Sequence, residues 1–185
     1  MFRAIVFAVQ DAGFVPRCSL ELSDATQNRL AKIEGIIAEC RYGIHDISRT
    51  EPSAAGLPRF NMPFEFGLFL GCKRYGGSAQ RSKACLVLDR DPYRYQQFLS
   101  DIAGQDVEAH SNDPRRAVQR IRDWLRNVSR RSTVPGHLRI WRHYERFLED
   151  LPVICDELGH DLEEIPFIDY SEIVLDWLAE EVPRG

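Results

Sequence analysis

The feature that most constrains the fold is the alternation of short apolar runs with helical patterns along residues 1–132. A short apolar run that stops at polar or turn-forming residues is typical of a buried strand in a parallel sheet. We expect such strands over residues 4–9, 41–48 and 84–88. Strands that alternate with helices predict an α/β fold with right-handed crossovers, in this case a doubly wound, mainly parallel sheet.

The helices between these strands have recognisable starts. One is expected over residues 24–40, with Asp24 as N-cap and Gln27 completing a capping box. Another is expected to begin with Asn61 as its N-cap, and its apolar face is expected to carry Phe64, Leu68 and Gly71. Further along the chain we expect a short helix over 93–102, a short strand over 107–110 and a helix that starts at Asn112-Asp113-Pro114.

Beyond residue 132 the pattern is helical only, so the sequence predicts an α/β domain over 1–132 and a helical C-terminal extension over 133–185. Trp141, Tyr144 and Leu148 share one face of the first helix of this extension. Such a stripe is typical of packing against the sheet domain, and part of it is also suited to self-association into a homo-oligomer.

Composition narrows the functional classes. The net charge of −4 creates no overall field that would attract nucleic acid or an anionic membrane, so neither is an expected partner. The five cysteines are scattered, with no C-x-x-C pair, which argues against a zinc site and for reduced thiols in the cytoplasm. No segment has the apolar length of a signal peptide or a membrane span, and no motif indicates a metal or cofactor.

In an open α/β sheet, ligands bind beyond the carboxyl ends of the strands, where the strand order reverses. Three predicted strands end in polar residues: Gln10-Asp11, Asp46 with Ser48 and Arg49, and Asp89. The helix at Asn61 follows the second strand, so its N-terminus should open on the same cleft and favour an anionic group. Asp46 is as well suited to a cap or a loop-ordering hydrogen bond as to a ligand contact.

Glu65 is the residue with the strongest claim to chemistry. We expect it in the first turn of the Asn61 helix, between Phe64 and Phe66. The helix dipole favours its ionised form, whereas apolar neighbours raise its pKa. An acid near a helix start also has a purely structural interpretation, because it stabilises the helix dipole.

Two segments together resemble a known family. The strand that ends in Asp46-Ile-Ser48, followed by Asn61-Met-Pro-Phe-Glu65-Phe-Gly67, is similar to a pattern of nucleoside 2-deoxyribosyltransferase-like proteins and of TIR-like domains in bacterial defence proteins. The resemblance covers residues 2 to about 130, by motif order rather than by long identity. It departs from the family after the first expected strand, where Gln10-Asp11-Ala12-Gly13 replaces a short phosphate-binding turn.

The resemblance implies cleavage or transfer at the N-glycosidic bond of a nucleotide or NAD, in a flavodoxin- or TIR-like fold. Glu65 would be the catalytic carboxylate, acting as nucleophile or as stabiliser of positive charge on the sugar. Asp46 would position the sugar hydroxyls. The substrate-binding residues would be Gln10, Asp11, Ser48, Arg49, Asn61, Met62 and Asp89, with no cofactor.

Two other functions remain open at this point. The altered loop after the first expected strand and the added helices also suit a TIR-like module that binds a nucleotide or a protein partner without chemistry. A weaker alternative is a nucleic-acid-associated subunit that uses the arginine row of the helix over 113–131, although no aromatic stacking platform accompanies it.

Overall fold

The computed structural model describes residues 1–21, 26, 28–50 and 59–181, and the chain forms two compact units. Unit 1 comprises Met1–Ser23 and Val118–Gly185, and unit 2 comprises Asp24–Ala117. This division differs from the predicted boundary at residue 132. The difference arises because the N-terminal segment is a helix that packs with the C-terminal helices.

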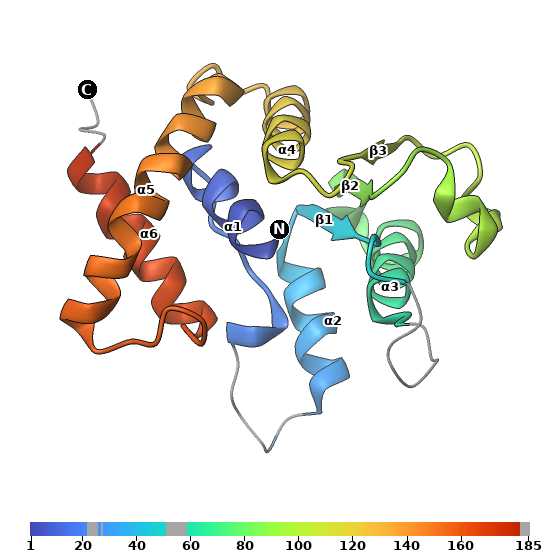
Figure 1. Ribbon diagram of the computed structural model, residues 1–185. Helices are drawn as coiled ribbons and strands as arrows, with labels where there is room; N and C mark the ends of the chain where they lie inside the picture. Colours follow the sequence, from blue (N-terminus) through green and yellow to red (C-terminus); the bar gives the residue numbers. More distant parts are fainter. Residues whose placement is uncertain (22–25, 27, 51–58, 182–185) are drawn as a thin grey trace. The chain divides into compact units, whose positions relative to one another are not determined.

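Unit 1 is helical. Phe7 is fully buried, and its ring lies 5.2 Å from the rings of Tyr144 and Phe147 and 6.0 Å from that of Trp177. These contacts hold the N-terminal helix against two C-terminal helices, as Figure 1 shows. The elements of the unit are α1 (Phe2–Asp11), the 3₁₀ helix η1 (Ser19–Glu21), most of α4 (Pro114–Ser129), α5 (His137–Leu158) and α6 (Phe167–Glu181).

The strand predicted over residues 4–9 is wrong, because this segment is the middle of α1. A continuous apolar run suits a helix that is buried on most of its circumference as well as a buried strand, and periodicity alone does not separate the two. Here Ala4, Val6, Phe7, Ala8 and Val9 are all buried. On α5, Tyr144 is buried as expected of the predicted stripe, whereas Leu148 is 43% exposed.

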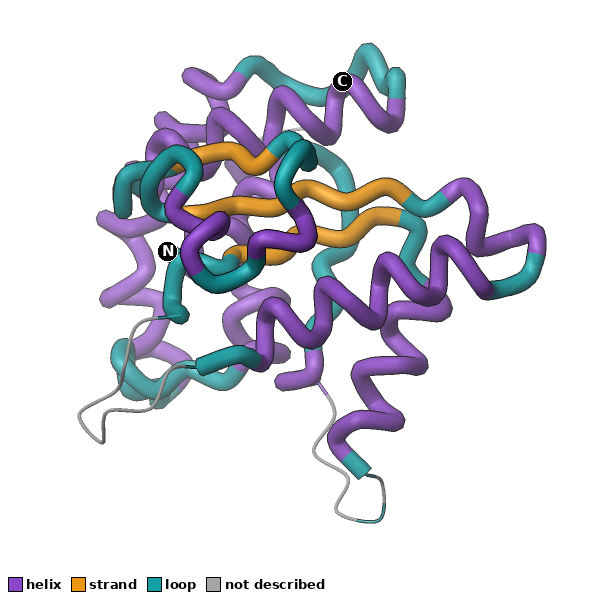
Figure 2. The backbone as a smooth tube through the Cα atoms, turned by 90° about the vertical axis from the view of Figure 1, so that its right-hand side faces the viewer, coloured by secondary structure: helices purple, strands orange, loops and turns teal. Residues whose placement is uncertain are grey.

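Unit 2 contains a three-stranded parallel sheet with the strand order β1-β2-β3 (Figure 2). The strands predicted over 41–48, 84–88 and 107–110 are confirmed as β1 (Tyr42–Asp46), β2 (Ala84–Asp89) and β3 (Val107–Ala109). In the register, Asp46 lies opposite Leu88, and Asp89 lies opposite Ala109. The fold of this unit is therefore α/β. Its described strands follow chain order, without the reversal expected of a doubly wound sheet.

The helices of unit 2 build two apolar clusters. Phe66 packs with Ile47, Val87 and Tyr95, and Phe69 packs between the helices with Ile33. The predicted apolar face of the Asn61 helix is wrong, since Phe64 is 54% exposed. The elements are α2 (Arg29–Glu39), α3 (Asn61–Tyr75), the start of α4 and the 3₁₀ helices η2 (Ser78–Ser82), η3 (Arg94–Gln97) and η4 (Ser100–Ile102); the last two replace the helix predicted over 93–102.

Two helix starts differ from the prediction. The side chain of Asn28 caps α2, accepting a hydrogen bond from the Leu30 N–H at 2.8 Å, while Asp24 and Gln27 lie outside the described residues. The N-cap of α3 is Phe60, so Asn61 is the first helical residue rather than the cap. The predicted start of α4 is confirmed.

Lys83 connects the end of α2 to the start of β2. It is almost fully buried, and its Nζ donates to the carbonyl oxygens of Ile37 and Cys40. These oxygens belong to the last turn of α2, where helical carbonyls lack partners. The ammonium also lies 5.2 Å from the centre of the Phe69 ring. The buried ammonium of Lys83 is thus stabilised by the carbonyl oxygens at the C-terminus of a helix and by the face of an aromatic ring.

His45 is buried on the face of β1 that α3 covers. Its ring lies 5.4 Å from that of Phe66 and 5.3 Å from that of Phe69. Neither ring nitrogen has a hydrogen-bond partner in the part of the chain that the structure describes. Gly43 lies on the same face, and a Cβ there would approach His45 Nε2 to 2.8 Å and Phe69 Cε2 to 2.9 Å.

The burial of His45 predicts acid sensitivity. Desolvation lowers its pKa from 6.5 to about 4, so unit 2 favours the neutral ring. The contribution of neutral His45 to the unfolding free energy is therefore fully present above pH 6.5. It is lost as the pH falls towards 4, and the total loss is about 3 kcal/mol at most. Urea unfolding of His45→Phe should show a smaller fall in unfolding free energy over this range than the unaltered chain. An identical fall in both proteins would contradict the prediction.

Candidate functional site

Polar side chains gather at the carboxyl ends of the three strands of unit 2. Asp46 is the last residue of β1 and Asp89 the last residue of β2, as predicted. His110 follows β3 directly and was not predicted as a site residue. Adjacent parallel strands end at the same edge of a sheet, so this edge is where the unit presents its polar groups.

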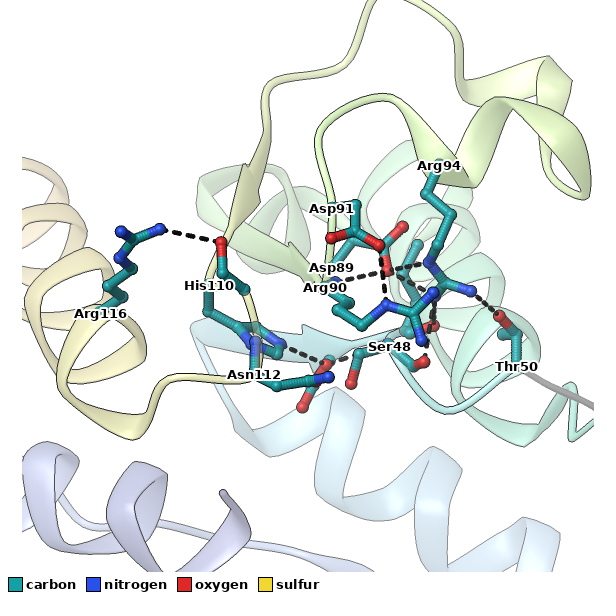
Figure 3. Close-up of polar contacts among 12 residues, drawn as sticks. Ser48, Thr50, Asp89, Arg90, Asp91, Arg94, His110, Asn112 and Arg116 are labelled. Atoms are coloured by element: carbon teal, nitrogen blue, oxygen red, sulfur yellow. Dashed lines mark hydrogen bonds and ion pairs between the residues drawn. The ribbon is translucent and has the colours of Figure 1, made fainter.

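Asp89 is fully buried and binds Arg94. Its Oδ1 accepts hydrogen bonds from the Arg90 N–H at 2.7 Å and from Arg94 Nε at 2.9 Å (Figure 3). Oδ2 is buried without a hydrogen-bond partner among the described residues. The structure therefore gives Asp89 an internal partner, and its predicted contact with substrate stays a prediction.

Arg94 extends this contact to the segment that follows β1. Its Nη1 donates to Thr50 Oγ1 at 3.2 Å, and its Nη2 donates to the carbonyl oxygens of Ile47 and Ser48 at 3.1 Å each. One guanidinium thus ties residues 47–50 to the end of β2. The planar fork of arginine suits this geometry, because it supplies several fixed donors at once.

Asp46 is held from two sides. Its Oδ1 accepts from the Ser48 N–H at 3.0 Å and lies 3.4 Å from His110 Nε2. Burial alone would raise the pKa of Asp46, but the hydrogen bonds from His110 and Ser48 outweigh it and lower the pKa below its usual value. The carboxyl group is 20% exposed, so the structure presents an ionised, oriented carboxylate at the edge of the sheet.

Glu65 lies one residue deeper in its helix than predicted. With Phe60 as N-cap, it is the fifth residue of α3 and belongs to the second turn. It is half-buried, and burial raises its pKa, an effect that Arg29 partly opposes. Within the described residues no hydrogen bond joins Glu65 to Asp46, Asp89 or His110.

The other predicted substrate contacts of unit 2 occupy different environments. Asn61 and Arg49 are exposed, Asn61 at the start of α3 and Arg49 after β1. Met62 packs on the apolar cluster of Phe66. Ser48 uses its backbone N–H for Asp46. The structure thus brings Ser48 to Asp46 directly, and gives Met62 a packing role.

Gln10 and Asp11 do not follow a strand, because they end helix α1 in unit 1. Gln10 Nε2 donates to the carbonyl oxygen of Ser171 at 2.9 Å and to its Oγ at 3.0 Å. Asp11 Oδ2 lies 2.9 Å from His143 Nδ1. Burial raises the pKa of Asp11, and His143 and Arg139 oppose the rise. The expectation that these residues end the first strand of the sheet is corrected.

His110 and Arg94 were not predicted as site residues from the sequence, although one sequence feature pointed to His110. The expected strand over 107–110 ended at His110, next to the strong helix start at Asn112-Asp113. In the structure Tyr93, Ser111 and Asn112 have φ values of 61°, 53° and 56°. Residues other than glycine adopt this left-handed region rarely, and they concentrate at functional sites. All three follow the carboxyl ends of β2 and β3.

No family model, curated protein or solved structure matches this chain. Among the described residues, no group of three or more His, Cys, Asp or Glu side chains is arranged to hold a metal ion. None of the described helices has both the length and the apolar character that a bilayer crossing requires.

The contacts of Arg94 predict a large effect of a conservative change. Arg94→Lys retains the charge, but a single ammonium cannot reach Asp89, Thr50 and the two carbonyl oxygens together. We expect a loss of about 2 kcal/mol in the unfolding free energy, measured by urea denaturation. The matched control is Arg115→Lys, since Arg115 is exposed in the same unit and its side chain should contribute little. Equal losses in both variants would contradict the assignment.

Proposed function

We propose that unit 2 cleaves or transfers the N-glycosidic bond of a nucleotide or NAD. The observation that carries the proposal is the opposite shift of two carboxyl groups: the pKa of Asp46 is lowered by hydrogen bonds, and the pKa of Glu65 is raised by burial. In many active sites, two carboxyl groups lie in environments that shift their pKa values in opposite directions. The two groups then take different catalytic roles.

The sequence pattern supports the same proposal. Asp46-Ile-Ser48 ends β1, and α3 begins with Asn61 and carries Glu65 followed by Phe66-Gly67. This order of strand, aspartate, helix and glutamate resembles nucleoside 2-deoxyribosyltransferase-like and TIR-like proteins. The finer fold class, doubly wound and flavodoxin- or TIR-like, is part of the proposal, and parallel strands connected through α3 are compatible with it.

The proposed roles follow from the environments. The oriented carboxylate of Asp46 accepts hydrogen bonds from sugar hydroxyls and fixes the ring. The carboxylate of Glu65 attacks the anomeric carbon or stabilises positive charge on the ring as the base leaves. Glu65 works in its ionised form, so activity should rise with pH as this group loses its proton, at a pH above that of an ordinary glutamate.

A second candidate is a module that binds a nucleotide without chemistry. It is favoured by the lack of any hydrogen bond between Glu65 and the Asp46 cluster among the described residues. Thermal-shift assays with NAD and nucleotides distinguish the two, because binding stabilises the folded state whether or not turnover follows. Stabilisation without base release supports the module.

The wider setting belongs to the proposal as well. We place the protein in the cytoplasm, with reduced cysteines, and assign it to a bacterial defence function because of the TIR-like resemblance. Exposed apolar residues on α5, such as Leu148 and Val153, suit self-association through the C-terminal helices.

The catalytic role predicts a specific loss on mutation. Glu65→Gln and Asp46→Asn should each reduce base release from NAD or deoxynucleotides by about 100-fold or more, because the charge at the reacting ring is lost. The control is Glu34→Gln, an exposed acid on α2 in the same unit. Base release is measured by chromatography of the free base. If the unaltered protein and the three variants are equally inactive on a broad panel of nucleotides, the enzyme proposal is wrong.

A further inference from the structure

His110 is the buried polar residue of unit 2 that the proposed chemistry leaves unexplained. It follows β3, its side chain is fully buried, and its ring lies against Asp46 at the end of β1. These two strands are not neighbours, since β2 lies between them. The ring therefore spans the end of β2 to reach the carboxylate.

The hydrogen bonds select one tautomer of the His110 ring. Nδ1 lies 3.0 Å from the backbone nitrogen of Asn112, whose N–H donates to it (Figure 3). A hydrogen on Nδ1 would oppose that N–H, so the ring hydrogen is on Nε2. From Nε2 it points to Asp46 Oδ1, 3.4 Å away. The ring is a fixed donor, and its acceptor nitrogen is already occupied.

The turn that supplies the Asn112 N–H is conformationally costly. Ser111 and Asn112 both have positive φ values, and each such residue costs about 1 kcal/mol or more unless it is glycine. Asparagine tolerates this region better than serine. The turn is secured by Asp113, whose Oδ1 accepts the Arg115 N–H at 2.9 Å, and by Arg116 Nη1, which donates to Ser111 Oγ at 2.9 Å. The conformation is therefore held by the start of α4.

The result at Asp46 is an oriented carboxylate. Oδ1 receives the Ser48 N–H and the His110 Nε2–H, and the side chain of Ser48 also forms a hydrogen bond with the carboxyl group. The side chain is partly exposed, so the carboxylate can still accept a hydrogen from a bound molecule. A carboxylate held in this way is oriented before the ligand arrives, which reduces the cost of binding.

We propose that His110 is a positioning residue that fixes Asp46 so that its partly exposed carboxylate receives a ribose hydroxyl. The contact with the sugar rests on the proposed function. The orientation of Asp46 by the Nε2–H tautomer stands on the geometry of the free protein and is tested separately.

Two variants of the full chain distinguish the roles of the two nitrogens of the His110 ring. The amide NH₂ of His110→Gln reaches approximately as far as Nε2 and keeps a donor for Asp46. The shorter His110→Asn keeps an acceptor for the Asn112 N–H but does not reach the carboxylate. Both replacements are polar, and their side chains are no larger than that of histidine. Circular dichroism verifies that the two variant proteins fold.

The first readout needs neither ligand nor turnover. Nitrogen NMR of the unaltered protein should show the His110 hydrogen on Nε2. Carbon NMR of the Asp46 carboxyl group should show that its pKa rises towards the ordinary value in His110→Asn and stays low in His110→Gln, because only the latter keeps the hydrogen bond. A hydrogen on Nδ1, or a carboxyl pKa that is the same in His110→Asn as in the unaltered protein, would overturn the proposal.

The second readout is NAD affinity by calorimetry. It should fall about tenfold or more in His110→Asn and no more than about threefold in His110→Gln. Equal losses in both variants would reduce His110 to a structural residue and overturn the inference. If the unaltered chain binds neither NAD nor any nucleotide of the panel, the proposed function and the sugar contact both fail, while the NMR result still decides whether His110 orients Asp46.

Discussion

The guanidinium of Arg94 is the contact on which the polar edge of unit 2 depends. It binds the fully buried Asp89 at the end of β2 and also the hydroxyl of Thr50 and two carbonyl oxygens after β1. Without it, a buried carboxylate would lose its counter-charge and the segment after β1 would lose its attachment. Because Ser48, whose N–H binds Asp46, belongs to that segment, the orientation of the candidate site depends on this internal ion pair.

His45 and Asp46 are neighbours on β1, and the pleat of the strand directs their side chains to opposite faces. His45 points into the aromatic cluster of Phe66 and Phe69, where none of the described residues gives it a hydrogen bond, and Asp46 lies against His110 on the opposite side of the strand. Two histidines of unit 2 thus have contrasting roles. His45 contributes apolar packing in its neutral form, and His110 contributes a directed hydrogen bond.

The strands of the sheet could be predicted from the sequence because each combines a short apolar or β-branched run with a clear turn after it. The helix start at Asp113-Pro114 was equally clear. The segment over residues 4–9 was misassigned because buried helices and buried strands have the same composition, and only its packing against α5 and α6 distinguishes them. Of the site, Asp46 and Asp89 could be placed at strand ends, since those ends are local features. The contacts of His110 with Asp46 and of Arg94 with residues 47–50 could not, because they join residues 44 to 64 positions apart.

Gly43 has a consequence for chains that share this unit. A side chain at that position would collide with His45 and with Phe69, two residues that lie 24 positions apart in the sequence. In a homologous sequence where position 43 carries alanine or a larger residue, both rings must move away from the new side chain or be replaced by smaller side chains. Compensating exchanges among these three positions would therefore be the evolutionary trace of the packing between β1 and α3.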